Sequence, residues 1–183
     1  MKLTEKGNAD AIKQLAGYYD RGRMGMTQNW AKANELYLKA GELGCANGYY
    51  NLGQSYNEGT GVTIDKKKAK HFYELAAMNG DIMARYNLGC LEGQAGNHRR
   101  AMKHFLIAGR AGYTDALSMI KQGFMNGYVA KEEYTTTLRA YQKRKDDMKS
   151  DMRDKALAHG MVPPSLAGGL YGMVPPSLAG GFY

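Results

Sequence analysis

Two short segments contain residues of the types used in phosphate binding and in nucleophilic catalysis. Residues 59–62 read Gly-Thr-Gly-Val ahead of a lysine-rich segment, and a glycine-rich loop before a helix can hold a phosphate through backbone N–H groups. A preceding strand and the Gly-Lys-Ser/Thr ending are both missing, so we interpret these glycines as turn residues. Ser118 and Lys121 have the Ser-x-x-Lys spacing in which a lysine can activate a serine. Because the Ser-Asp-Asn and Lys-Thr-Gly companions of that motif are missing, we expect no catalytic residue.

The histidines and cysteines are not spaced as a metal site. The sequence has four histidines and two cysteines, Cys45 and Cys90, with no Cys-x-x-Cys pair. A zinc site would need ligands from distant segments, and two such cysteines do not supply a disulfide framework. We therefore predict no metal and no cofactor, and reduced thiols in the cytoplasm or another reduced intracellular compartment.

The positive charge is spread along the chain. The 25 basic and 17 acidic residues give a net charge of +8, and the two basic runs lie at residues 66–70 and 98–100. Both runs have side chains that contact phosphates in nucleic-acid-binding proteins, so a nucleic-acid partner is a weaker alternative to a protein partner. No segment approaches the roughly 20 apolar residues of a membrane span. The chain is therefore expected to be soluble and to have no membrane partner.

An internal repeat runs through most of the sequence. Residues 50–53 and 86–89 both read Tyr-Asn-Leu-Gly, 36 residues apart, and this register aligns five columns at intervals of 32 to 37 residues. The columns are Leu15, Leu52, Leu88 and Ile120; Ala33, Ala69 and Ala101; Tyr37, Tyr73 and Phe105; Ala40, Ala76 and Ala108; and Gly44, Gly80 and Gly112. A fixed period of this length indicates a repeat protein.

Each repeat has the apolar spacing of two helices. In the second repeat, apolar and small residues recur at helical intervals in both halves. Gly59 and Gly80 are expected to end these helices, because glycine readily adopts the left-handed backbone that closes a helix. Asp65 is expected to cap the start of the second helix. Because one helical hairpin cannot bury both of its faces, neighbouring hairpins should stack into an α-solenoid.

The segment from Ala46 to Gly80 resembles the Sel-one-like repeat. It reads A-x(3)-Y-N-L-G-x(2)-Y-x(2)-G-x-G-V-x(2)-D-x(3)-A-x(3)-Y-x(2)-A-A-x(2)-G. The resemblance covers roughly residues 8 to 145. It implies an all-α fold, namely an α-solenoid of helix-turn-helix repeats with a right-handed superhelix, related to tetratricopeptide arrays. It also implies an adaptor or scaffold that binds other proteins and is not a catalyst.

The repeats and the C-terminal sequence together predict the domain organisation. The repeat array spans residues 8–145, with units at about 8–44, 45–80, 81–112 and 113–145. The second half of the fourth unit drifts by about one residue, and Leu138 is expected in the place of Phe105. Mixed charges at residues 146–159 predict a C-terminal capping helix. Residues 160–183 are a tandem duplication rich in proline and glycine, which predicts a disordered tail and a route to self-association.

The first helix of each repeat is expected to line the partner-binding groove, as the resemblance to tetratricopeptide arrays implies. The register places ten residues on this face: Lys13, Gly17, Asn47, Tyr50, Gln54, Met83, Tyr86, Cys90, Ser118 and Gln122. Tyr50 and Tyr86 are the sharpest candidates, because tyrosine is enriched in interfaces. The same two rings would equally suit packing against the next helix. Leu52 and Leu88 lie two residues further along and should face the core.

These observations predict a scaffold that binds a protein or peptide of unknown identity in the groove of the array. Two alternatives stay open. One is a basic solenoid that binds nucleic acid, whose retention on a polyanion resin would collapse with rising salt. The other, based on Ser118 and Lys121, is an enzyme or a penicillin-interacting-like repeat protein associated with one. Labelling by an acylating probe that is lost in Ser118→Ala would indicate this second alternative.

Overall fold

The computed structural model describes residues 2–159 of the 183-residue chain. This part consists of eight α-helices and contains no strand, which confirms the predicted all-α class. The helices are α1 (Lys2–Arg21), α2 (Trp30–Glu42), α3 (Ala46–Glu58), α4 (Lys66–Met78), α5 (Ile82–Gln94), α6 (His98–Arg110), α7 (Thr114–Met125) and α8 (Lys131–Ala158).

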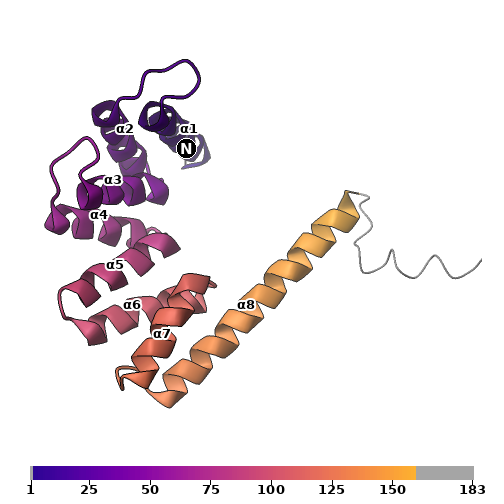
Figure 1. Cartoon of the computed structure of the whole chain (residues 1–183). Helices are drawn as coiled ribbons and strands as arrows, with labels where there is room; N and C mark the ends of the chain where they lie inside the picture. Colours follow the sequence, from indigo (N-terminus) through magenta and orange to yellow (C-terminus); the bar gives the residue numbers. More distant parts are fainter. Residues whose placement is uncertain (1, 160–183) are drawn as a thin grey trace, which may run out of the picture. The chain divides into compact units, whose positions relative to one another are not determined.

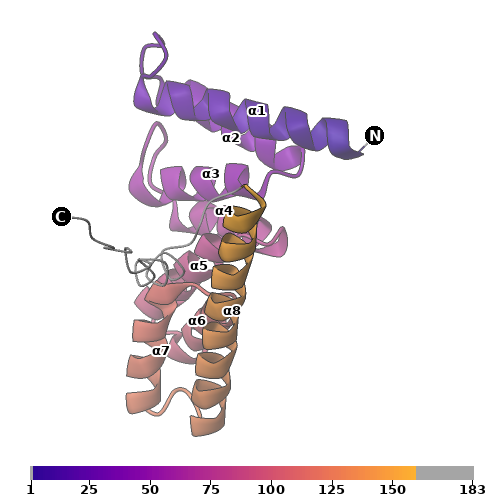
Figure 2. The ribbon, with the colours of Figure 1, turned by 90° about the vertical axis from the view of Figure 1, so that its right-hand side faces the viewer.

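Helices α1 to α7 stack in chain order, each against the helix before it (Figures 1 and 2). The pairs α1 with α2, α3 with α4, and α5 with α6 form the hairpins of three repeats, and each second helix also contacts the first helix of the next repeat. This arrangement is the α-solenoid that the repeats predict. Of the described residues, the stack and the start of α8, up to residue 142, form one compact unit, and the rest of α8 belongs to a second.

Capping residues define the ends of the helices in each repeat. The Asp65 carboxylate accepts hydrogen bonds from two backbone N–H groups in the first turn of α4, both at 3.0 Å. Gly59 ends α3 with a φ angle of 83°. Gly44, Gly80 and Gly112 follow the second helices with φ angles of 91°, 90° and 97°, a backbone that glycine adopts without steric cost. The recurring glycine is therefore required by the turn between repeats, and the predicted cap and breaks are confirmed.

The aligned apolar columns form the core, except for Leu15, which is only partly buried. Leu52, Leu88 and Ile120 of the first helices are at most 4% exposed. In the second helices, the six alanines of the two aligned alanine columns are at most 1% exposed, and so are Tyr73 and Phe105. Each of these first-helix residues shares a cluster with the aromatic residue of the preceding repeat, namely Tyr37, Tyr73 or Phe105. Apolar burial therefore joins each hairpin to its neighbours, which is the main source of stability in a stacked array. The predicted burial of Leu52 and Leu88 is confirmed.

The segment predicted as the fourth repeat differs from the sequence expectation at one core position. Thr137, which lies 32 residues after Phe105, is fully buried, whereas Leu138 is 37% exposed. The prediction that Leu138 takes the place of Phe105 is therefore wrong. Threonine is accommodated there because Arg110 Nε donates a hydrogen bond to its Oγ1 at 3.1 Å, and a buried polar group needs such a partner.

Helix α8 passes through the predicted boundary between residues 145 and 146 as one helix of 28 residues. The second helix of the predicted fourth unit and the predicted capping helix at 146–159 are thus parts of a single helix. Met148 and Met152 in its second part are 55% and 61% exposed, and the capping role stays a prediction. The duplicated tail at residues 160–183, predicted to be disordered, lies outside the described residues.

Candidate binding face

Three hollows follow one another along the first helices of the repeats. The first is lined by α1 and α3, the second by α3 and α5, and the third by α5 and α7. Their volumes are about 320, 170 and 540 Å³, respectively. Cys90 and Gln94 line both the second and the third hollow, so these two adjoin. We call the surface formed by the three hollows the first-helix face.

The three hollows have the same plan in successive repeats. The floor of each contains the buried aromatic residue of a second helix, namely Tyr37, Tyr73 or Phe105. One side of the first, second and third hollow carries Gly17, Gln54 and Cys90, respectively, and these three residues occupy the same position in their repeats. The facing side carries Asn51, Asn87 and Met119, which also share one repeat position. The fold therefore builds one hollow three times, and the residue types at equivalent positions change its chemistry.

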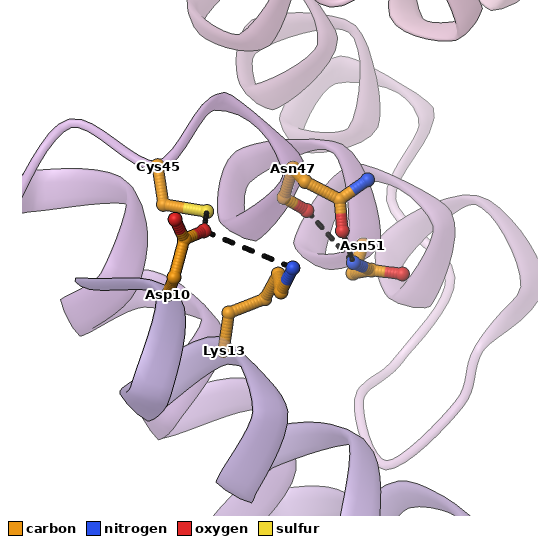
Figure 3. Close-up of polar contacts among 5 residues, drawn as sticks. All are labelled: Asp10, Lys13, Cys45, Asn47 and Asn51. Carbon is orange, nitrogen blue, oxygen red and sulfur yellow. Dashed lines mark hydrogen bonds and ion pairs between the residues drawn. The ribbon is translucent and has the colours of Figure 1, made fainter. Parts of the chain in front are cut away.

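The first hollow is polar and basic. Three basic side chains line it, together with the amides of Asn47 and Asn51. The side chain of Lys13, one of the three, extends from α1 towards these two asparagines of α3 (Figure 3). Lys13 Nζ lies 3.8 Å from Oδ1 of Asp10, and Asn51 Nδ2 donates to Oδ1 of Asn47 at 2.8 Å. This end of the face is suited to a polar or anionic group.

Tyrosine hydroxyls and side-chain amides line the second hollow. Tyr50 and Gln54 of α3 face Asn87 of α5, and the ring centroids of Tyr50 and Tyr73 are 6.1 Å apart. Burial raises the pKa of both tyrosines above the ordinary value of 10. Both hydroxyls are therefore protonated at neutral pH and can donate hydrogen bonds as well as accept them.

The third hollow is the largest and the most apolar. Met102, Phe105 and Met119 line it, together with polar side chains that include Gln94, His98, Gln122 and Asn126. Burial raises the pKa of the Cys90 thiol above its ordinary value of 9. The thiol is therefore protonated at neutral pH, and a protonated thiol is neither a nucleophile nor a good metal ligand. This hollow is suited to an apolar side chain.

The hollows bring together five of the eight residues proposed from sequence as the partner-binding set. These are Lys13 and Asn47 in the first hollow, Tyr50 and Gln54 in the second, and Gln122 in the third. They come from three helices of the stack, α1, α3 and α7, and their role in binding a partner stays a prediction.

Met83, Tyr86 and Ser118, the other three proposed residues, do not line these hollows. Met83 is 38% exposed. The Tyr86 ring packs against Phe105 and Tyr113, with centroid distances of 5.3 and 5.1 Å, and burial raises the pKa of Tyr86 to about 12. The sequence left two roles open for Tyr50 and Tyr86, partner binding or packing against the next helix. Tyr86 fits the packing role, whereas Tyr50 lines a hollow and also lies against Tyr73, so it fits both roles.

Sequence reasoning missed the two asparagines that line facing sides of the hollows. Asn51 lines the first and Asn87 the second. Both belong to the identical Tyr-Asn-Leu-Gly segments, so their recurrence is visible in the sequence. The recurrence alone does not place them in a hollow, because that depends on the helices that face them.

The glycine-rich loop at residues 59–62 is packed against the start of α2. A Cβ atom on Gly61 would lie 2.5 Å from Cβ of Trp30 and 2.9 Å from its carbonyl carbon. Asn34 Nδ2 also donates a hydrogen bond to the carbonyl oxygen of Thr60 at 2.9 Å. The glycines thus permit close packing between two repeats, which agrees with their interpretation as turn residues.

The other segments with possible chemistry are dispersed or engaged elsewhere. Ser118 Oγ donates to the carbonyl oxygen of Asp115 at 2.8 Å, and the Lys121 side chain is exposed to solvent. Within residues 2–159 no three His, Cys, Asp or Glu side chains are placed to hold a metal ion. The helices in that range also lack the combination of length and apolar character needed to cross a bilayer.

Three of the four lysines in the basic run at residues 66–70 interact within the chain. Lys66 Nζ donates to Oδ1 of Asn57 at 2.7 Å, Lys68 Nζ lies 5.2 Å from the centroid of the Tyr56 ring, and Lys70 is ion-paired with a carboxylate. These contacts occupy side chains that phosphate binding would require. The basic run thus serves contacts within and between repeats.

A buried ion pair joins the second and third repeats. Glu92 takes the repeat position of Tyr56 and is 4% exposed. Its carboxylate accepts hydrogen bonds from Lys70 Nζ at 2.6 Å and from Asn97 Nδ2 at 2.8 Å. The hydrogen bond from the Lys70 ammonium holds the pKa of Glu92 below its ordinary value of 4.5.

Lys70→Met is expected to lower the free energy of unfolding by about 1 to 2 kcal/mol at neutral pH, because it removes a charged hydrogen bond from a buried carboxylate. Lys67→Met, at an exposed neighbouring position, is the matched control and should change stability by less than about 0.5 kcal/mol. Because Glu92 has a lower pKa in the folded state, the stabilisation is present above pH 4.5 and is lost as the pH falls through that lowered pKa. Urea denaturation between about pH 3 and 7 measures this. A Lys70→Met defect of undiminished size in acid would contradict the assignment.

The stacked hairpins, with one hollow repeated between their first helices, define an α-solenoid repeat protein. The family model of the Sel1 repeat matches residues 9–45, 46–81 and 82–113, and the chain belongs to the Sel1 repeat family. Each matched range lies one residue after the corresponding predicted unit. The predicted unit at 113–145 stays a prediction.

The chain is similar to parts of longer curated proteins. It is 34% identical over 103 residues to the ERAD-associated E3 ubiquitin-protein ligase component HRD3B of Arabidopsis thaliana, covering 55% of this chain and 16% of the relative. It is 34% identical over 88 residues to the chitin synthase regulator SKT5 of Saccharomyces cerevisiae, covering 48% of this chain and 12% of the relative. The matched segments thus span less than a fifth of either relative.

Solved structures share the fold. A protective antigen of uropathogenic Escherichia coli with an SLR fold superposes with a TM-score of 0.63 and 22% identity, over 77% of this chain and 32% of the antigen. A Sel1 repeat protein from Oxalobacter formigenes superposes with a TM-score of 0.59 and 22% identity, over 78% of this chain and 58% of that protein. At this identity the likeness shows the fold alone.

Proposed function

We propose that the chain is a scaffold that binds an extended segment of a partner protein along its first-helix face. The observation that carries this proposal is the hollow that recurs, on one plan, in three successive repeats. An extended peptide presents side chains at regular spacing, and regularly spaced hollows are suited to receive them. The different lining of each hollow would then select the side chain that it receives.

Side-chain amides support a peptide as the ligand. They occur along the whole face: Asn47, Asn51, Gln54, Asn87, Gln94 and Gln122. An amide both donates and accepts hydrogen bonds, and so does each backbone unit of an extended peptide. The two relatives have names that describe a component of a ligase and a regulator of a synthase, roles that agree with a protein partner.

Gln54→Ala combined with Gln122→Ala is expected to weaken peptide binding about 10-fold or more, because two side-chain amides that hydrogen-bond the ligand are removed. The probe is a peptide selected from a random 12-residue library on the full chain and then synthesised with a fluorophore. Fluorescence anisotropy measures its Kd for each protein. Neither substitution removes a fully buried side chain, so the melting temperature should change by no more than about 2 °C.

The matched control is Glu74→Ala combined with Lys103→Ala, two exposed positions on the second helices α4 and α6. It truncates two side chains of similar length outside the hollows, and the Kd should stay within about twofold of wild type. Equal affinity of the selected peptide for the glutamine variant and wild type would refute binding along the first-helix face.

A further inference from the structure

We propose that the first hollow binds a carboxylate of the peptide ligand, so that the ligand has an acidic group at the α1 end of the face. This inference rests on the proposed peptide-binding function and specifies its ligand. It follows from how charge is distributed over the three hollows, and from how the basic side chains of the first are held.

Basic charge on the first-helix face is concentrated in the first hollow. Lys13, Arg21 and Arg23 line it, and its lining contains no Asp or Glu. The second hollow contains Glu58, and the third contains no Lys, Arg, Asp or Glu. An anionic group would therefore be attracted to the first hollow and repelled from the second, and it would meet no Lys or Arg in the third.

Among the described residues only Lys13 of the three cations has an ion-pair partner, although the charge of Asp20 also acts on the Tyr37 hydroxyl of this hollow. Lys13 has a loose ion pair with Asp10 at 3.8 Å, and the side chain of Asp10 is 58% exposed. Among the described residues, Arg21 and Arg23 form no ion pair. A bound carboxylate would pair with them, and a guanidinium presents two parallel N–H groups that match both carboxylate oxygens.

The turn that carries Arg23 is held in place by backbone hydrogen bonds. The Arg23 N–H donates to the carbonyl oxygen of Tyr18 at 3.0 Å, and the Asn29 N–H donates to that of Tyr19 at 2.8 Å. Gln28 Nε2 donates to the carbonyl oxygen of Asp20 at 2.8 Å. These bonds occupy carbonyl groups at the C-terminal end of α1, whose partial negative charge would otherwise oppose an anion.

The floor of the first hollow offers a further hydrogen-bond donor. Burial raises the pKa of Tyr37 to about 12, so its hydroxyl is protonated at neutral pH. The equivalent floor residue of the third hollow is Phe105, which has no hydroxyl. The first hollow thus combines three cations with a neutral donor, as carboxylate recognition requires.

The test selects a random 12-residue peptide library with free C termini on the full chain and on two variants. Lys13→Met with Arg23→Gln removes two charges from the hollow. Lys67→Met with Arg99→Gln removes two charges from exposed sites at the starts of α4 and α6, and so controls for net charge. Arg21→Gln with Arg23→Gln is a second hollow variant, and circular dichroism melts check that every variant is folded.

Peptides selected on wild type and on the charge control should contain a required carboxylate, and those selected on the hollow variants should not. Replacing the enriched Asp or Glu by Asn or Gln, or amidating the C terminus, identifies which carboxylate is bound. Removal of the bound carboxylate from a peptide selected on wild type should weaken the binding of that peptide to wild type about 10-fold or more. The same removal should weaken its binding to the hollow variants less than about threefold.

Two results would overturn the inference and are distinguishable. If peptides bind in a manner that depends on Gln54 and Gln122 but is insensitive to every carboxylate, the inference is wrong and the proposed function stands. If no selected peptide depends on Gln54 and Gln122, the proposed function fails and the inference fails with it.

Discussion

Leu88→Ala is expected to destabilise the chain by about 2 to 5 kcal/mol, the largest effect among the substitutions considered. Leu88 is 1% exposed and belongs to the cluster that contains Tyr73 and Ala84. Its truncation removes buried methyl groups and leaves a cavity between the second and third repeats. Because the stability of a short repeat array depends on contacts between neighbours, loss of this contact should also reduce cooperativity.

The matched control for Leu88→Ala is Leu38→Ala on α2, where the leucine is 37% exposed. Its effect should stay below about 1 kcal/mol. Urea denaturation followed by circular dichroism measures both variants. Equal effects at the two positions would mean that Leu88 does not pack between the repeats.

Gly48→Ala is expected to destabilise the chain by about 1 to 3 kcal/mol, although alanine is the better helix former. A Cβ atom at position 48 would lie 2.6 Å from the carbonyl oxygen of Tyr37 and 2.7 Å from the backbone nitrogen of Gly41. Both are backbone atoms of α2, so relief of the clash requires α2 and α3 to separate. The first and second repeats would therefore lose part of their interface.

Gly17→Ala on α1 is the matched control and should have the opposite sign. The nearest atom to its added Cβ would be the Tyr37 hydroxyl oxygen at 3.8 Å, an ordinary contact. Alanine there should raise the free energy of unfolding by up to about 1 kcal/mol, through helix propensity alone. The comparison fails if both alanine variants shift the urea midpoint in the same direction.

Features that depend on neighbours in the chain were predictable from the sequence. Tyr73 and Ala76 are buried as their helical spacing predicts, because helical periodicity decides which side chains share a face. Gly80 adopts a positive φ angle, and Asp65 caps α4, since both effects depend on the local backbone. The register itself located the first helices, and with them Lys13 and Gln54 of the candidate site.

The error at Leu138 shows where this reasoning fails. Threonine is a poor candidate for a core position by type, and leucine is a good one. Thr137 is nevertheless buried, because Arg110 of the preceding repeat supplies its hydrogen-bond partner. That partner lies 27 residues away in the chain, so the local pattern carries no information about it.

The sequence by itself thus determined the repeat, most of its helices, the cap at Asp65 and most of the residues that face the core, because each depends on spacing within about 40 residues. Only the tertiary structure decided which side chains form the hollows, since each hollow is lined by at least three helices. It likewise decided that a Cβ at Gly48 would clash with backbone atoms of α2 while one at Gly17 would make only an ordinary contact with the Tyr37 hydroxyl, and that Glu92 is buried with Lys70 as its partner. These properties depend on distances between separate helices, which stacking sets and which residue type and spacing along one helix do not encode.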